Sequence, residues 1–218
     1  MSTKNMSTNT ATVVRELEVE GVTSFHGLTF DGKNVWFADA TRGGLTAIDP
    51  ETGKAVKRLA DVPADAGTAF DGTHLYQIAE DRIQKVDPKN GEILGTIPAP
   101  AGQCAGLAWA EGALWVGQYK ERLLHKIDAK TGKILKTIKS DRFVTGVTWV
   151  DGELWHGTQE AGTSDVRRVD PESGAVTECL AVPGMNVAGI EADRSGHIWL
   201  ADTKRGKVVA INRPRARS

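Results

Sequence analysis

Three ionisable side chains in this sequence have the types and positions that acid/base chemistry needs. His26 precedes a glycine at the start of an apolar strand, and an imidazole can accept or donate a proton near neutral pH. Glu191 follows a glycine in another apolar strand, where a buried carboxylate needs a cation, a donor or water. His156 interrupts a column whose other members are Phe37, Gln77, Val116 and Leu200. His26, Glu191 and His156 are therefore the candidate catalytic residues.

Carboxylates at the ends of strands could also hold a metal. Asp39, Glu191 and Asp202 supply the oxygen ligands that Ca or Mg prefers, so a divalent cation is the expected cofactor if there is one. Other interpretations remain open, because Asp39 and Asp202 could instead cap turns and His156 could be a satisfied core residue. Cys104 could act as a nucleophile with His26 as its base, but the sequence shows no third group to orient the pair.

The candidate residues lie within five copies of one pattern. Each copy begins with a small residue and a glycine, and these glycines recur about every 40 residues, which is the period of a four-stranded propeller blade. An apolar pair with an aromatic follows in each copy: Val35-Trp36, Leu75-Tyr76, Leu114-Trp115, Leu154-Trp155 and Ile198-Trp199. Four copies then run into an Asp-x-x-x-Gly segment. These segments lack the alternating oxygen ligands of a calcium loop, so we interpret them as hairpin turns.

The repeats predict a closed ring. In the third copy, the period-two pattern predicts strands at residues 105–109, 114–118, 123–127 and 134–138. The last copy supplies only three strands, at 187–192, 198–202 and 208–212, and a spare strand stands upstream at 12–19. We expect this spare strand to complete the last blade and to remove its open edge. The predicted fold is therefore an all-β, five-bladed propeller of four-stranded antiparallel blades.

The ring also predicts where ligands bind. Turns between the first and second strands are short and alike, whereas the segments that connect successive copies vary, and variable loops on a constant scaffold commonly carry function. The channel mouth would receive Cys104, Thr145 and a set of candidate ligand-binding residues. These candidates are Ser24, Asp65, Glu80, Gln103, Gln118, Tyr119, Phe143, Gln159 and Asn186.

Composition narrows the class of protein further. A formal net charge of −1 gives no reason to expect nucleic acid or an anionic membrane as a partner. The two cysteines lie in different copies, which favours free thiols over a disulfide framework. We expect a disordered N-terminal tail at 1–11, one propeller domain at 12–213 and a basic tail at 214–218. A monomer in the cytoplasm is expected, or in the periplasm if a leader was removed.

Across essentially the whole chain, the repeats resemble those of the bacterial glutamine cyclotransferase-like propellers, and they are similar to YncE-like and virginiamycin B lyase-like proteins. Ser24-Phe25-His26-Gly27-Leu28 is similar to the Phe-Thr-Gln-Gly-Leu stretch that opens the cyclotransferase repeats. The turn ending Ile48-Asp49-Pro50-Glu51-Thr52-Gly53 also fits their pattern. The last repeat looks more like a lyase or gluconolactonase-type repeat.

The departures from that family bear on activity. The resemblance places the glutamate of a Tyr-Glu-Ser-Thr-Gly stretch where this chain has Phe37, and phenylalanine cannot handle protons. The sequence thus predicts a propeller that binds a small polar ligand or peptide terminus at its channel mouth but is not a glutaminyl cyclase. A metal-assisted hydrolase or lyase with His26 as acid/base is one form of this function. The alternative is a non-enzymatic scaffold that binds a protein through Tyr119, Phe143 and residues 159–164.

Overall fold

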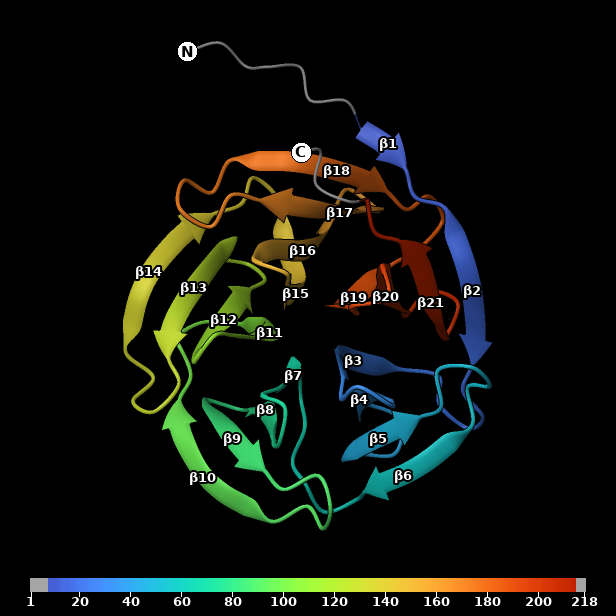
Figure 1. The fold of residues 1–218 in the computed structure, drawn as a ribbon, viewed down its shortest axis with the longest axis vertical. Coiled ribbons are helices and arrows are strands. Elements are labelled where there is room, and N and C mark those ends of the chain that lie inside the picture. Colours follow the sequence, from blue (N-terminus) through green and yellow to red (C-terminus); the bar gives the residue numbers. More distant parts are fainter. Residues whose placement is uncertain (1–7, 215–218) are drawn as a thin grey trace.

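The computed structural model describes residues 8–214. Five sheets stand around a central axis like the blades of a propeller (Figure 1), and the first strand of each blade lies nearest the axis. The predicted all-β, five-bladed architecture is confirmed. Within the described range there is no helix of the length and hydropathy that crossing a membrane would require. Residues 215–218, most of the predicted basic tail, lie outside the described part of the chain.

Each blade is an antiparallel meander, numbered here in chain order. The first contains β3 (Phe25–Phe30), β4 (Val35–Asp39), β5 (Leu45–Ile48) and β6 (Ala55–Leu59). The second contains β7 (Thr68–Phe70), β8 (Leu75–Ala79), β9 (Arg82–Val86) and β10 (Ile93–Pro98). The third contains β11 (Cys104–Ala110), β12 (Ala113–Gln118), β13 (Leu123–Asp128) and β14 (Ile134–Lys139). The fourth contains β15 (Phe143–Val150), β16 (Glu153–Glu160), β17 (Thr163–Val169) and β18 (Val176–Ala181). The fifth contains β19 (Val187–Ala192), β20 (His197–Asp202), β21 (Lys207–Asn212) and β2 (Val13–Glu18).

The core lies between blades, because both faces of the middle strands are covered. Every residue of β12 is buried, and Trp115 and Trp155 are almost completely excluded from solvent. Burying one such aromatic removes on the order of 150–250 Å² from water. The Asp-x-x-x-Gly segments are hairpin turns as predicted. In the first of them, Asp49 Oδ1 accepts the backbone N–H groups of Glu51 (2.9 Å) and Thr52 (2.8 Å).

Glycines close the narrow centre of the ring. A Cβ built on Gly27, Gly67, Gly106, Gly146 or Gly189 would lie within 3 Å of backbone atoms of the next inner strand. Gly189 in turn meets Gly27, so the contacts run around the whole circle. We call these five residues the glycine ring. It brings the backbones of neighbouring inner strands into close contact around the axis.

The N-terminal segment closes the molecule at its outer edge. Strand β2 pairs antiparallel with β21, as the spare strand at 12–19 predicted. The prediction of a disordered tail through residue 11 is wrong for its last part, because β1 (Thr8–Thr10) pairs in parallel with β18. The outer edge of the fourth blade has free backbone groups, and an extended Thr-Asn-Thr segment can satisfy them. Residues 1–7 of the predicted tail lie outside the described part of the chain.

Candidate functional site

A cavity of about 450 Å³ opens at the end of the axis where the inner strands begin. All five residues that precede the ring glycines line it: His26, Ala66, Ala105, Thr145 and Ala188. In four blades the pairing register between the first and second strands shifts next to the ring glycine. Such β-bulges commonly change the direction in which a side chain points. In the second blade, the Ile78 carbonyl oxygen accepts the backbone N–H of Asp65, and the Ile78 N–H donates to the carbonyl oxygen of Gly67. These two hydrogen bonds lie on either side of Ala66. Three of these five residues are alanine, so His26 and Thr145 supply the polar side chains of this set.

The remaining lining residues come from the loops before the inner strands and from the ends of the second strands. They are Ser24, Asp65, Gln103, Cys104, Tyr119, Gln159, Asn186, Val187 and Thr203. Of the predicted site residues, the structure therefore brings together Ser24, His26, Asp65, Gln103, Tyr119, Gln159 and Asn186. Sequence reasoning missed Thr203, whose hydroxyl and N–H both donate to the Asn186 carbonyl oxygen (3.2 and 3.0 Å). Its signal was available, because it directly follows the strand-end residue Asp202.

His26 is half-buried and its imidazole has no hydrogen-bonding partner in the part of the chain that the structure describes. Burial lowers the pKa of this histidine, and the negative charge of Asp65 opposes that shift without reversing it. A neutral imidazole is the form that can accept a proton or a hydrogen bond at pH 7. The ring is thus free to contact whatever occupies the cavity.

Asp65 faces the cavity beside His26 from the second blade. One of its oxygens, Oδ2, accepts the backbone N–H of Glu80 at 2.7 Å, which anchors the loop before β7. Within residues 8–214 its carboxylate has no ion-pair partner. Glu80 itself, a predicted ligand-binding residue, does not line the cavity and instead pairs with Arg82 at 2.6 Å.

The wall between the third and fourth blades is held by aromatic and amide groups. The Tyr119 hydroxyl donates to Gln159 Oε1 at 3.0 Å, and the Tyr119 ring stacks on Phe143 with centroids 4.9 Å apart. Phe143 was predicted to touch ligand, but it lies outside the lining and supports Tyr119 from the other side. Gln118 is also outside, because its amide is bound to the Ala101 carbonyl oxygen (2.7 Å) and His125 (3.0 Å).

Thr145 carries an unused polar group in the cavity wall. Its side chain is 5% exposed, and its hydroxyl has no hydrogen-bonding partner among the described residues. A buried hydroxyl without a partner costs free energy unless water or a ligand satisfies it. Gly157 leaves room for this hydroxyl, since a Cβ there would come within 2.8 Å of Thr145 Oγ1.

His156 does not belong to this cavity. It is 1% exposed on β16, and burial together with the nearby Arg167 guanidinium lowers its pKa to about 4. The uncharged ring is therefore part of the interior, but it is not the satisfied core residue that the sequence left open, because its Nδ1 has no hydrogen-bonding partner among the described residues.

Glu191 lies beyond the glycine ring from His26. Its carboxylate accepts the hydroxyls of Thr29 (3.2 Å) and Thr148 (2.8 Å) and the N–H of Phe30 (3.1 Å). All three donors follow their ring glycines, whereas His26 precedes its own. Burial raises the pKa of Glu191 to about 7. The structure therefore does not join His26 and Glu191 in one site.

The three predicted metal ligands do not converge. The Asp39 carboxylate accepts hydrogen bonds from Arg42 Nε (2.7 Å), two backbone N–H groups and the Thr46 hydroxyl. The Asp202 carboxylate accepts hydrogen bonds from Arg205 Nε (2.5 Å) and from two backbone N–H groups. Among residues 8–214, no group of three or more His, Cys, Asp or Glu side chains could hold a metal ion. Asp39 and Asp202 thus serve as turn caps, the alternative that their strand-end positions suggested.

Cys104 lines the cavity as a thiol. Burial raises its pKa to about 11, so the thiolate that nucleophilic catalysis requires is scarce at neutral pH. Its sulfur lies 3.3 Å from the Pro100 carbonyl oxygen. The Cys104 and His26 pair that the sequence left open therefore lacks an activated nucleophile as well as an orienting third residue.

The fold and this cavity define the class of the protein, a five-bladed β-propeller with a cavity on its axis. No protein-family model and no curated protein matches the chain. Among solved structures, Myxococcus xanthus glutaminyl cyclase is similar with a TM-score of 0.78, at 17% identity over 95% of this chain and 98% of that one. A chain of the mitotic checkpoint complex gives a TM-score of 0.57 at 12% identity, with 97% and 94% covered.

Kuenenia stuttgartiensis hydrazine synthase gives a TM-score of 0.56 at 18% identity, where 84% of this chain covers 56% of the other. At these identities the likeness concerns the fold. The fold that the resemblance to cyclotransferase-like propellers implied is thus confirmed, and activity has to be argued from the cavity.

Proposed function

We propose that this propeller binds a small polar ligand or a peptide terminus in the axial cavity, in contact with His26. The observation that carries the proposal is the column of five residues before the glycine ring. Its three alanines leave space, and among the described residues neither the His26 imidazole nor the buried Thr145 hydroxyl has a hydrogen-bonding partner. Concave pockets with a few convergent polar groups are the usual places for small ligands.

If the ligand is a substrate, His26 is the residue able to move a proton. Its lowered pKa keeps the imidazole in the basic form at neutral pH, and Asp65 can stabilise the imidazolium that forms on proton transfer. Hydrolysis or elimination assisted by this base is the reaction class we propose.

Glutaminyl cyclisation is not the reaction we propose. Phe37, which stands where the resemblance places a proton-handling glutamate, is fully buried and packs against Phe25 with ring centroids 5.3 Å apart. It cannot reach the cavity or carry a proton. A glutaminyl peptide should therefore give no pyroglutamyl product, and measurable turnover would refute this part of the proposal.

The alternative of a protein-binding scaffold has less support from the same residues. Phe143 packs between Tyr119 and the Arg122 guanidinium, which lies 4.5 Å from the ring centroid. Residues 159–164 form the ends of β16 and β17 with a tight turn between them. Phe143 is therefore engaged by its neighbours, and of residues 159–164 only Gln159 lines the cavity.

The proposal is tested by a binding screen of purified protein. Thermal shift with a library of small polar compounds and short peptides should find stabilising ligands, and isothermal titration should measure their affinity in the presence and absence of EDTA. We expect His26→Gln to weaken binding at least tenfold, whereas His74→Gln, on an outer turn, should not. Binding that survives His26→Gln unchanged would contradict the proposal.

A further inference from the structure

One formal charge dominates the cavity lining. Four ionisable side chains are among the described residues that line the cavity: Asp65, His26, Cys104 and Tyr119. Asp65 carries a charge, whereas His26 is a neutral imidazole, Cys104 a protonated thiol and Tyr119 a phenol. The other polar groups are amides and hydroxyls. A ligand in this cavity therefore meets a carboxylate and several neutral acceptors.

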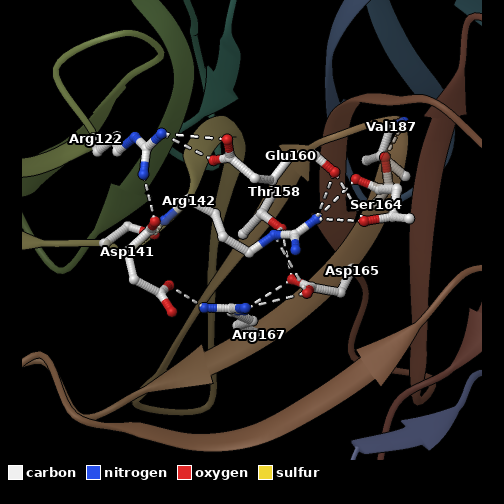
Figure 2. Close-up of polar contacts among 11 residues, drawn as sticks. Arg122, Asp141, Arg142, Thr158, Glu160, Ser164, Asp165, Arg167 and Val187 are labelled. Carbon is white, nitrogen blue, oxygen red and sulfur yellow. Dashed lines mark hydrogen bonds and ion pairs between the residues drawn. The ribbon is translucent and has the colours of Figure 1, made fainter.

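Five arginines at this end of the molecule are already paired with acidic residues, and Arg58 donates to the backbone carbonyl oxygens of Arg42 and Gly43. Arg42 binds Asp39 (2.7 Å), Arg82 binds Glu80 (2.6 Å) and Arg205 binds Asp202 (2.5 Å). Figure 2 shows the other two pairs, Arg122 with Glu160 (3.0 Å) and Arg142 with Asp165 (3.5 Å). One arginine per blade is thus held by an acidic partner, and none of the five lines the cavity.

The remaining charges near the rim, two lysines and one glutamate, lie outside the lining. Lys120 and Lys204 are exposed neighbours of Tyr119 and Thr203, but neither lines the cavity. Glu121 is an acid beside the rim, where its carboxylate oxygens lie 3.3 Å from the N–H of Gln103. Its charge adds to that of Asp65.

We infer that the cavity selects ligands that carry a protonated amine, with Asp65 as the specificity-determining residue. This inference rests on the proposed function and names the chemical class of its ligand. One oxygen of Asp65 is bound to Glu80 N–H, and the other remains for the ammonium. An ammonium has three donors, and the amide oxygens of the lining and the neutral imidazole can accept the rest. An anionic ligand would find no cation in the lining to balance its charge.

The size of the effect follows from the exposure of Asp65. Its carboxylate is solvent-exposed, so the attraction is that of a screened ion pair and not of a buried one. We therefore expect the amine to bind about threefold to fivefold more tightly than its uncharged analogue, and the preference to shrink as salt concentration rises.

The test compares probes that share a skeleton and differ in charge. One set is glucosamine, glucose and glucuronate, and the other is 1,4-diaminobutane, 1,4-butanediol and succinate. Dissociation constants are measured by titration calorimetry or ligand-observed NMR for the wild type, Asp65→Asn and Asp81→Asn. The asparagine at 65 can still accept the Glu80 N–H, so the loop should keep its shape. Asp81→Asn is the matched control, because Asp81 is an exposed acid outside the lining.

The expected result is that the amine binds best in at least one set, and that its preference falls to less than twofold in Asp65→Asn but persists in Asp81→Asn. Neutral or anionic members that bind at least as tightly as the amine would overturn this inference while leaving the proposed function intact. An amine preference that survives Asp65→Asn would also overturn it. Failure of all six probes and of the wider polar library would overturn both proposals.

Discussion

At the scale of single residues, two titratable groups on the inner strands have different surroundings. His26 meets the open cavity and a nearby negative charge, whereas Glu191 is surrounded by the donors Thr29, Thr148 and Phe30 N–H. Desolvation acts on both and disfavours the charged form of each. It therefore lowers the pKa of the histidine and raises that of the glutamate.

The pKa of His26 should respond to Asp65. An NMR titration of the wild type should place the His26 midpoint below the ordinary histidine value. Asp65→Asn should lower the midpoint further, because it removes the negative charge that stabilises the imidazolium. Asp81→Asn should leave it unchanged. A midpoint that rises in Asp65→Asn would show that the two side chains do not interact as the structure indicates.

Glu191→Gln should change how stability depends on pH. The folded-state pKa of about 7 lies above the usual value of 4.5, so between these pH values the folded chain keeps a proton that the unfolded chain has released. Wild-type stability therefore falls as pH rises through this window. The glutamine variant lacks this loss and should be more stable at pH 8 by roughly 1–3 kcal/mol. Urea unfolding at pH 4.5, 6 and 8 measures the difference, and equal pH profiles for the two proteins would contradict it. Glu20→Gln, an exposed change, is the control.

At the scale of the strands, the first turn of most blades supplies an acceptor for the indole of the second strand. Trp36 donates to Asp31 (2.6 Å), Trp155 to Glu153 (3.0 Å) and Trp199 to Asp193 (2.9 Å). In the third blade, the Trp115 indole N–H is buried without a partner in the described chain. Ala113 stands two residues before it, in the position that Glu153 occupies before Trp155.

Ala113→Glu should therefore stabilise the protein. The new carboxylate can accept the Trp115 N–H as Glu153 accepts that of Trp155, and a hydrogen bond to a charged group contributes about 1 kcal/mol or more. The melting temperature should rise by about 2–4 °C for a chain of this length. Ala113→Leu adds a side chain of similar size without an acceptor and should not stabilise. Equal melting temperatures for the two variants would exclude the hydrogen bond as the cause.

At the scale of the whole molecule, the ring is closed twice. The glycine ring closes it at the axis, and the pairing of β2 with β21 closes it at the rim. Arg213 adds a contact between blades, since it follows β21 and binds Asp151 (2.7 Å) and Glu153 (3.1 Å) in the fourth blade. Closure removes the open sheet faces that would otherwise be exposed.

Gly146→Ala should disrupt this closure. The new Cβ would lie 2.5 Å from Ile190 N and against other backbone atoms that cannot move aside cheaply, so we expect a loss of more than about 3 kcal/mol. Gly95→Ala is the matched control, because nothing lies within 4 Å of its built Cβ and its φ is not positive. It should change stability by less than about 0.5 kcal/mol. Similar unfolding curves for the two variants would show that the inner strands can separate without cost.

The sequence alone predicted many of the residues that line the cavity, because repeats can be compared column by column. The column before each glycine pointed to His26 and Thr145, and loop positions pointed to Ser24, Asp65 and Asn186. The prediction from the sequence failed where the direction of a side chain depends on neighbouring residues in the folded structure. Phe143 turns behind Tyr119, and Gln118 is engaged by Ala101 and His125. Comparing the repeats of one sequence position by position does not reveal such contacts between blades.

The sequence by itself determined the number of blades, their strands and the closing segment, because period-two burial and turn chemistry are local properties that repeat along the chain. Only the tertiary structure decided that His26 lines the cavity and that Glu191, two residues beyond its own ring glycine, does not. Where each side chain lies depends on how five blades pack around one axis, with backbones in close contact at the glycine ring, and no individual repeat encodes that packing.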